Sequence, residues 1–309
     1  MMVESLDLPP IIRPQLLRRG DVVRLVSPAS PVSQAVLDRA AEILSGWDLQ
    51  VEFADHVLAR SGYLAGSDGE RLADLDAAFR DPNVRAVIAT RGGKGSYRIA
   101  DQLDFNAMSR DPKWLVGFSD ITILQLALQR HCGLVCAHGA VAWHFEGTPV
   151  EAHASGLRKI LIGGEPLCIA SLAQEPTRQL TSRGTARGRL IGGNLDLIAT
   201  AAGWALPDLR GAILLLECVD KHPGEVDRPL TMLVKGGHLH GVAGFAIGRL
   251  SGHSDKGNAM LRAILAGHLA RFDVPVLGGL PVGHGPGTVA IRTGGMAELD
   301  ADRGLLKVE

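Results

Sequence analysis

Residues 114–122 read WLVGFSDIT, and this stretch decides how the first half of the chain is interpreted. An apolar run ends at Gly117-Phe118-Ser119-Asp120, and apolar residues at helical spacing begin at once. The pattern predicts a strand that turns sharply into a helix. A serine at such a corner is either a helix N-cap, with Asp120 in the first turn, or a nucleophile exposed above a sheet. The G-x-S-x-G signature of hydrolase elbows is incomplete here, so the stretch alone favours the cap.

The same alternation of strand and helix continues on both sides of this corner. Short apolar runs predict strands at 21–27, 51–56 and 84–90, and helical spacing predicts helices at 33–46, 66–81, 96–103 and 120–131. Ser33 and either Ser67 or Asp68 are expected as N-caps, and Gly46 as a stop signal. Strands that alternate with helices indicate a parallel sheet covered by helices, with functional residues at the carboxyl ends of the strands.

The second half of the chain has a different pattern. The polar stretch 173–188, AQEPTRQLTSRGTARG, is typical of a linker or an exposed hairpin. Short β-type runs follow, among them RLIGGNLDLIATAAGW, with fewer helices, one of them near 257–271. The final residues, 296–309, predict a hairpin that turns at Asp-Arg-Gly.

The length of 309 residues suggests two domains. We therefore expect an α/β fold with an N-terminal, doubly wound, mainly parallel sheet domain and a second, β-rich C-terminal domain. The nucleophile-bearing domain is expected over 1–160, a linker over 161–185 and the β-rich domain over 186–309.

Composition limits the classes of function. A net charge of −1 gives no basic face for broad nucleic-acid binding. The start of the chain has no apolar signal segment, and no apolar run is long enough to cross a bilayer, so we expect a cytoplasmic protein with no membrane partner. In HCGLVCAH, residues 131–138, the spacing of Cys132 and Cys136 fits no zinc template, and core packing is favoured over a metal site.

Three further features each follow an apolar run. The loop RGGKGS at 91–96 has glycines that free N–H groups to face an anion, although it matches no phosphate-loop fingerprint. Glu217 ends the run LLLE, where a carboxylate needs a partner, either a histidine that it orients or a salt bridge to Lys221 or Arg228. His284 lies between glycines in LPVGHGPG, a suitable place for a general base.

Motifs along nearly the whole chain resemble the LD-carboxypeptidases, the serine peptidase family that also holds the microcin C immunity proteins. They are GDVVRLVSPASPV, the run from GYLAGSDGE to RGGKGSYRIADQLDF, VGFSDITIL, GRLIGGNLDLI, LLLECVDKHPGEVDRPLTML and LPVGHGPGTVAIRTG. The resemblance implies that Ser119 is the nucleophile, Glu217 the acid of the triad and His284 the base. It also implies an oxyanion hole made of the backbone N–H groups of Gly93 and Asp120.

The sequence departs from the family pattern at two points. Lys94 stands where the family loop usually reads RGGYG, and Gly203-Trp204 stands where Gly-Thr is usual. The first departure lies beside the predicted oxyanion hole and therefore bears on how substrate is held. Candidate partners for a substrate carboxylate are Arg91, Lys94 and Arg228.

The resemblance also implies a reaction. It is removal of the terminal D-alanine from cytoplasmic muropeptide tetrapeptides during cell-wall recycling. The resemblance further implies that a Ser-His-Glu triad carries out the reaction without cofactor or metal, and that the protein is a homodimer. An alternative with the same chemistry is an immunity-type hydrolase of aminoacyl-nucleotide conjugates, which needs an aromatic platform for the base. Only 4% of the residues are aromatic, and Trp204 and Phe245 are the candidates. A different class, a non-enzymatic module that binds a small ligand, needs no reactive serine.

Overall fold

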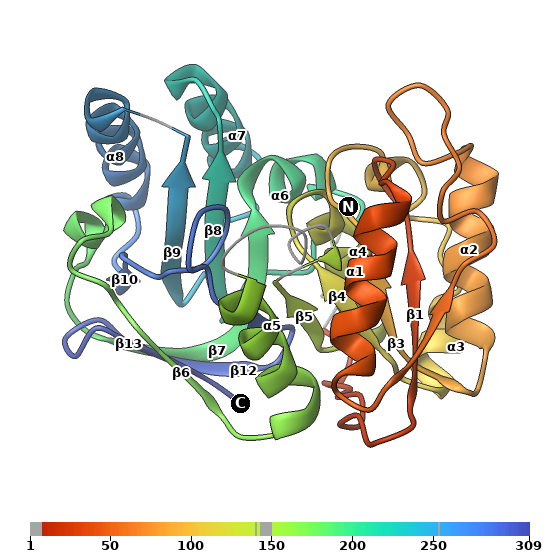
Figure 1. Cartoon of the computed structure of the whole chain (residues 1–309). Coiled ribbons are helices and arrows are strands. Elements are labelled where there is room, and N and C mark those ends of the chain that lie inside the picture. The colour runs from red at the N-terminus through yellow and green to blue at the C-terminus, as the bar shows by residue number, and fades with distance from the viewer. Residues whose placement is uncertain (1–7, 140, 143–149, 253) are drawn as a thin grey trace.

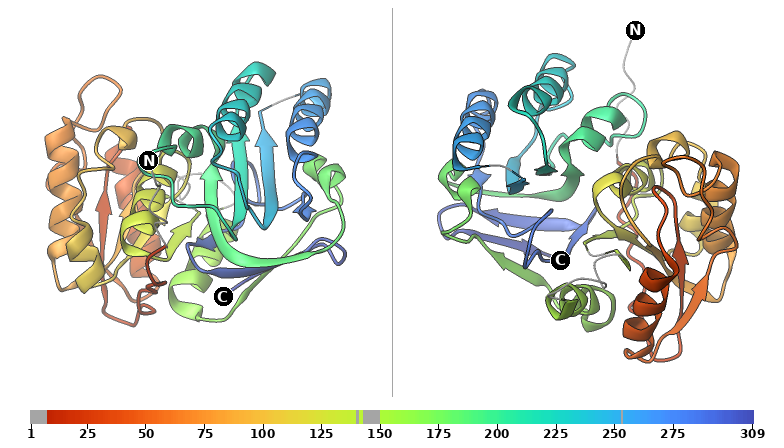
Figure 2. Two further views of the ribbon diagram at one scale, coloured as in Figure 1. Left: turned by 180° about the vertical axis from the view of Figure 1, so that it is seen from behind. Right: turned by 45° about the horizontal axis from the view of Figure 1, so that its top comes forward.

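Two β-sheets lie side by side in the computed structural model, and each carries its own helices (Figure 1). The structure describes residues 8–139, 141–142, 150–252 and 254–309. Two further views show the same division into two lobes (Figure 2). Ser119, the loop 91–96 and Glu217 lie at or near the carboxyl ends of parallel strands.

The first sheet has the strand order β11-β5-β4-β3-β1-β2. Its strands are β1 Val22–Val26, β2 Gln50–Phe53, β3 Val84–Ala89, β4 Trp114–Gly117, β5 Cys136–His138 and β11 Ile291–Thr293. All pairs are parallel except β11 with β5. The helices of this lobe are α1 Gln34–Ser45, α2 Asp68–Arg80, α3 Phe105–Arg110 and α4 Thr122–Cys132. The predicted doubly wound, mainly parallel sheet is therefore confirmed.

The second sheet has the order β10-β9-β8-β7-β12-β13-β6 and is parallel in one half and antiparallel in the other. Its strands are β6 Leu167–Ala170, β7 Thr185–Asn194, β8 Ile213–Val219, β9 Gly244–Ser251, β10 Val276–Leu277, β12 Met296–Asp300 and β13 Leu305–Val308. The helices are α6 Leu195–Ala201, α7 Pro223–Lys235 and α8 Asp255–Leu269, and α5 Val150–Arg158 precedes this sheet. The predicted C-terminal hairpin is formed by β12 and β13.

The two lobes share one continuous apolar core. Helix α4 of the first lobe packs against α6 and β7 of the second, and buried side chains form a single cluster across this junction. Strand β11, from the C-terminal part of the chain, adds itself to the edge of the first sheet. Close-packed interiors deform little, so this junction fixes the ends of β4 and β8 relative to one another.

Two local predictions were wrong. Residues 96–103 form only a short 3₁₀ turn, Ser96–Arg98, instead of a helix, and the Ser96 N–H at its start is bound by the Asp120 carboxylate at 2.7 Å. Residues after Asn194 form helix α6 rather than a strand, since the Asn194 side chain caps the helix at the Asp196 N–H, 3.2 Å away. The stretch 173–188 is mainly the connection between β6 and β7, and it contains a 3₁₀ turn, Pro176–Leu180, and the start of β7.

The helix caps follow the sequence signals in part. Ser67 forms a capping box with Glu70, as the serine and the glutamate three residues later predict. Ser33 occupies the N-cap position of α1, but its side chain makes no capping hydrogen bond. Gly46 ends the same helix, as predicted. Among the helices of the described chain, none has both the length and the apolar character needed to cross a bilayer.

Candidate active site

Ser119 lies at a strained corner between β4 and α4. Its φ of 61° is in the left-handed region, which a residue with a Cβ occupies only when its surroundings force it there. A Cβ on Gly117 would lie 2.6 Å from Ile121 Cγ2, so this turn requires a glycine. Ile121 stands where the second glycine of the hydrolase signature would be, and it packs against the first. The corner therefore has the form of a nucleophile elbow although the signature is incomplete.

The RGGKGS loop lies directly against this corner. A Cβ on Gly92 would approach Ser119 Cβ to 2.9 Å and Ser119 Oγ to 3.2 Å. The next residue, Gly93, has a φ of 107°, and a Cβ there would collide with Ser30 Oγ at 2.3 Å. Ser30 also fixes the loop, because its hydroxyl accepts the Lys94 N–H at 3.2 Å. Glycines at these positions let the backbone reach the serine.

The side chain of Asp120 joins the loop to the elbow. It is only 2% exposed and accepts the Ser96 N–H at 2.7 Å. Burial raises the pKa of Asp120 to about 6, against the lowering effect of the Ser96 hydrogen bonds and of Arg71 and Lys94. Arg71 holds the same loop from behind, since it donates to the carbonyls of Pro28 at 2.6 Å and Gly95 at 3.0 Å.

Replacement of Asp120 by asparagine is expected to stabilise the fold at pH 7. The pKa rises from 3.8 to about 6, so between these values the native state holds a proton that the unfolded chain has lost. Stability therefore falls as pH rises through this window, by about 3 kcal/mol when the carboxylate is fully ionised. Asparagine keeps an oxygen acceptor for the Ser96 N–H and removes the charge. Urea unfolding at pH 4, 5, 6 and 7 measures the change.

The control for this variant is Asp38→Asn, on the exposed face of α1. Its pH dependence of the unfolding free energy is expected to match that of the wild type. The Asp120→Asn variant is expected to lose the fall in stability between pH 4 and pH 6. If it unfolds more easily than the wild type at pH 7, the account of Asp120 is wrong.

Glu217 and His284 form a hydrogen-bonded pair in the second lobe. His284 Nδ1 lies 2.7 Å from Glu217 Oε2. Glu217, near the carboxyl end of β8, has no exposed surface, and Gly283 is close enough that a Cβ there would lie 2.8 Å from Glu217 Oε2. Thr288 anchors the histidine loop, because its hydroxyl donates to Gly283 O at 2.6 Å. The sequence left open whether Glu217 pairs with a histidine or forms a salt bridge to Lys221 or Arg228. In the structure it pairs with His284, and Lys221 is paired with Asp196.

The histidine of this pair reaches the elbow of the other lobe. The ring of His284 packs against that of Phe118, the residue before Ser119, with ring centroids 4.6 Å apart. Ser119, Glu217 and His284 therefore gather at one junction, although they are widely separated in the sequence. The cap interpretation of Ser119 is not supported, since the 3₁₀ turn Ser119–Ile121 has Phe118 at its cap position and no side-chain capping bond.

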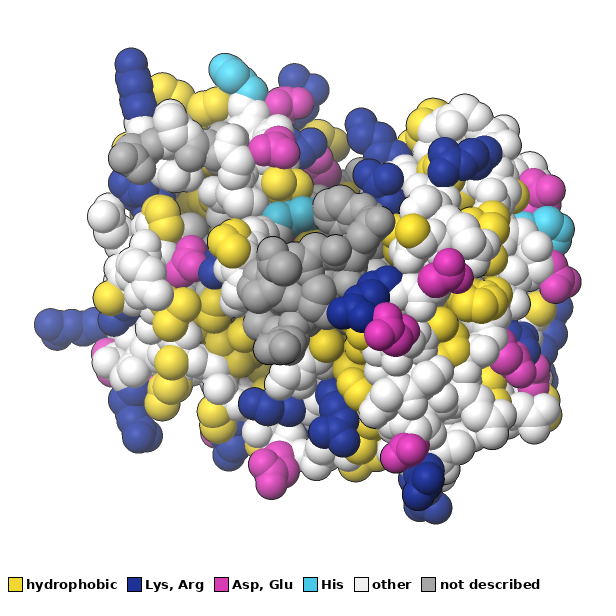
Figure 3. Space-filling model, in the orientation of Figure 1, with side chains coloured by type: hydrophobic (Ala, Val, Ile, Leu, Met, Phe, Trp, Pro, Cys, Tyr) yellow, Lys and Arg dark blue, Asp and Glu magenta, His cyan; other side chains and the backbone are white. Residues whose placement is uncertain are grey.

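The candidate cations lie in different places. Arg91 and Lys94 are exposed on the loop beside the elbow, and Lys94 acts electrostatically on Asp120. Arg228 is exposed on α7 and lines a separate pocket of about 350 Å³ between α6 and α7. Figure 3 shows several Lys and Arg side chains along the junction of the lobes on one face of the molecule.

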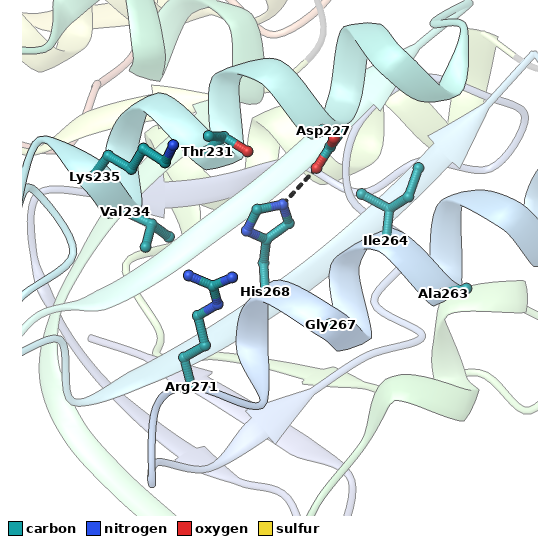
Figure 4. A pocket seen from close by; sticks show the side chains of 9 residues that line it. All are labelled: Asp227, Thr231, Val234, Lys235, Ala263, Ile264, Gly267, His268 and Arg271. Atoms are coloured by element: carbon teal, nitrogen blue, oxygen red, sulfur yellow. Dashed lines mark hydrogen bonds and ion pairs between the residues drawn. The ribbon is translucent and has the colours of Figure 1, made fainter.

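A pocket of about 270 Å³ opens beside His284. It is lined by Glu175, Thr177, Arg249, Ser251, His284 and Pro286, among others. Arg249 is held in place by Glu175 at 2.7 Å and by the Pro286 carbonyl at 2.6 Å. A larger pocket, about 440 Å³, lies between α7 and α8 and contains an Asp227–His268 pair (Figure 4). No triad candidate lines that second pocket.

Two residues near the pair were not singled out for chemistry from the sequence. Arg249 lies near the end of β9, next to β8, and His138 ends β5, next to β4. The rule that placed candidates at the carboxyl ends of parallel strands applies to both positions. His138 was considered only with Cys132 and Cys136, both of which are buried in the core.

Comparison with protein families gives two matches. Residues 23–139 match the model of the LD-carboxypeptidase N-terminal domain, and residues 187–299 match that of the C-terminal domain. A Streptomyces coelicolor protein named as a carboxypeptidase is 40% identical, over 97% of this chain and 96% of its own. The murein tetrapeptide carboxypeptidase of Pseudomonas aeruginosa is 32% identical, over 91% and 94%. A Bacillus subtilis protein named as a murein peptide carboxypeptidase is 34% identical, over 93% and 91%.

Solved structures share the fold of the whole chain. The muramoyltetrapeptide carboxypeptidase of Oxalobacter formigenes has a TM-score of 0.81 at 28% identity, covering 93% of this chain and 97% of its own. An MccF-like protein of Bacillus anthracis has a TM-score of 0.85 at 25% identity, covering 96% and 99%. Both members of this structural group have the two-lobed arrangement described above.

Proposed function

The chain belongs to the LD-carboxypeptidase family, and from that premise we propose that it removes the terminal D-alanine of a murein tetrapeptide through Ser119, His284 and Glu217. Membership makes it a serine-type carboxypeptidase. The observation that carries the site proposal is the 2.7 Å bond between Glu217 and His284, in a pair that packs on the elbow of Ser119. The nucleophile comes from the proposed domain 1–160 and the pair from the domain 186–309.

His284 is the general base of the proposed mechanism. An ionised carboxylate only accepts hydrogen bonds, so the Nδ1 that faces Glu217 carries the proton. The lone pair is then on Nε2, which takes the proton of the Ser119 hydroxyl as Oγ attacks the peptide carbonyl. Glu217 stabilises the imidazolium that forms. The histidine then donates the proton to the departing amine, and water releases the acyl group from Ser119 by the reverse sequence.

The oxyanion of the tetrahedral intermediate is bound, in this proposal, by the N–H groups of Gly93 and Asp120. The proposal is supported by the contact of Gly92, the residue before Gly93, with Ser119, since a Cβ on Gly92 would lie 3.2 Å from Ser119 Oγ. The bond from Ser96 to the Asp120 carboxylate keeps loop and elbow together. Each donor of such a pair contributes about 3–4 kcal/mol to the stability of the transition state.

The pocket beside His284 suits the small leaving group. The base must protonate the departing amine, so the terminal residue of the substrate lies on the side of His284. A volume of about 270 Å³ accommodates alanine and its carboxylate. Arg91 and Lys94, beside the elbow, remain candidates to bind the carboxylates on the acyl side of the substrate, and Arg228 remains a more distant one.

A substrate of this kind places the reaction in cell-wall recycling in the cytoplasm, and the family resemblance favours a homodimer. The alternative substrate, an aminoacyl-nucleotide, needs an exposed aromatic surface. Phe245 has no exposed surface and packs on Phe272, with ring centroids 5.4 Å apart, so it offers none. Trp204 is half-buried, and its Nε1 donates to Thr200 O at 2.6 Å.

The proposal is tested by release of D-alanine from the tetrapeptide L-Ala-γ-D-Glu-meso-diaminopimelate-D-Ala. The matched control is the same peptide ending in L-alanine, which we expect to be cleaved at least 10²-fold more slowly because the wrong centre leaves polar groups unpaired. An aminoacyl sulfamoyl adenylate is tested in parallel. Cleavage of the adenylate without release of D-alanine would overturn the murein substrate and keep the serine chemistry.

A further inference from the structure

His138 is a buried histidine that the proposed mechanism does not use. It ends β5 beside Gly117 of β4 on one side and Ile291 of β11 on the other. Only 1% of its surface is exposed, and neither ring nitrogen has a hydrogen-bond partner among the described residues. Buried polar groups are almost always paired, so an imidazole in this state needs an explanation.

The ring of His138 crosses from the first lobe toward the second. A Cβ on Gly193 would lie 2.8 Å from His138 Cε1, so this position of β7 requires a glycine for the ring to fit. The residue after it, Asn194, pairs with Glu217 across the β7–β8 ladder. On its other side the ring meets Phe118 edge-on, with centroids 6.0 Å apart. His138 therefore lies behind the junction of the elbow and the Glu217–His284 pair.

One carboxylate oxygen of Glu217, at the same junction, lacks a hydrogen-bond donor among the described residues. Its Oε2 bonds to His284, but its Oε1 is buried and has no partner among the described residues. A buried carboxylate oxygen without a donor is costly. A neutral imidazole has one N–H to give and one lone pair, so it can satisfy such an oxygen and still accept a bond.

Burial keeps His138 neutral. The titratable groups that act on it are Glu217 on β8 and His284 on the loop before β11. Burial lowers the pKa of His138 to about 4, with Glu217 raising it and His284 lowering it further. At physiological pH the ring is therefore a dipole rather than a charge, and it does not repel the imidazolium that forms on His284 during turnover.

We propose that His138 is a positioning residue for the Glu217–His284 pair, with its N–H directed through one bound water to Glu217 Oε1. A water with partners on both sides is a stable occupant of a buried polar site. With Oε1 held, the carboxylate cannot rotate, and Oε2 stays in line with His284 Nδ1. The inference rests on the proposed triad but not on the murein substrate.

The test compares His138→Leu, which removes both nitrogens, with His138→Gln, which keeps a donor and an acceptor. Cys136→Ala, on the same face of β5, is the control for loss of a buried side chain. Two rates are measured across pH 5 to 9, namely D-alanine release and labelling of Ser119 by a fluorophosphonate. The labelling needs the triad but no peptide, so it separates failure of this inference from failure of the proposed substrate.

We expect His138→Leu to lower kcat and the labelling rate about 10–100-fold with KM nearly unchanged. In the same variant the acid limb of the rate profile is expected to move to higher pH. A Glu217 carboxylate whose Oε1 lacks a hydrogen bond stabilises the protonated form of His284 more strongly. His138→Gln is expected to keep at least about half of the wild-type rate. Cys136→Ala keeps the wild-type profile.

A result in which His138→Leu labels and turns over within twofold of wild type would overturn the inference. So would equal losses in the Leu and Gln variants with an unshifted acid limb, since that pattern marks a structural role. Should the Leu variant fail to fold, ¹⁵N-histidine NMR of the wild type decides. One neutral tautomer of His138 with a slowly exchanging N–H from pH 6 to 8 supports the inference, and rapid exchange between tautomers contradicts it.

Discussion

Replacing Ser119 by alanine is expected to abolish D-alanine release, with a fall in kcat on the order of 10⁴-fold or more, because the acyl-enzyme can no longer form. The fold is expected to persist. Alanine and serine both carry a Cβ, so the strain of a φ of 61° is the same in the two proteins. A melting temperature within a few degrees of the wild type, measured by circular dichroism, accompanies the loss of activity.

Ser119→Gly is the matched control for the strained corner. Glycine occupies the left-handed region without cost, so this variant is expected to be inactive and at least as stable as Ser119→Ala. A capping serine would give the opposite pattern, because its removal costs about 1 kcal/mol of stability and leaves catalysis intact. Retained activity in the alanine variant, together with that loss of stability, would refute Ser119 as the nucleophile.

The first lobe was predictable because its signals are local. The strands β1, β3 and β4 are apolar runs in which most residues are buried, and turn residues or caps separate them from α1, α2 and α4. Each of these elements forms for reasons contained in its own ten or fifteen residues. Alternation of the two patterns then implies a parallel sheet, and a parallel sheet implies a site at the carboxyl ends.

The errors lie where distant groups override local preference. Residues 96–103 form only a 3₁₀ turn, Ser96–Arg98, which the bond from the Ser96 N–H to the Asp120 carboxylate fixes against the elbow, after Gly95 has turned the chain at a φ of 124°. Helix α7 was not predicted, although His222 and Glu225 form a capping box and Pro223 begins it, because Pro229 lies in its interior. A proline within a helical pattern ordinarily argues against a helix.

The site itself was predictable only as a set of separate candidates. Each of Ser119, Glu217 and His284 follows an apolar run, and the sequence alone shows this. Their meeting depends on α4 packing against α6 and β7, a contact between residues far apart in the chain. Neither ring nitrogen of His138 has a partner among the described residues, which is likewise a property of the packed junction that no pattern in HCGLVCAH reveals.

Replacing Glu217 by glutamine is expected to lower kcat about 10³–10⁴-fold while KM stays within a few-fold of the wild type. Glutamine fills the same volume but presents an N–H to His284 Nδ1. That hydrogen bond stabilises the tautomer with its proton on Nε2, which cannot accept the proton of Ser119. The variant also removes a buried charge of which one oxygen has no partner among the described residues, so its stability in urea is expected to equal or exceed that of the wild type.

The control for this substitution is Glu225→Gln, six residues after the end of β8. It removes the same charge from the capping box of α7, where Glu225 Oε2 accepts the His222 N–H at 2.8 Å, and it does not face His284. We expect this control to lose a few tenths to 1 kcal/mol of stability and to keep its kcat. The two variants thus separate the two readouts, since Glu217→Gln loses rate without losing stability and Glu225→Gln loses stability without losing rate. A Glu217→Gln enzyme with more than a tenth of wild-type kcat would show that the carboxylate does not set the tautomer of His284.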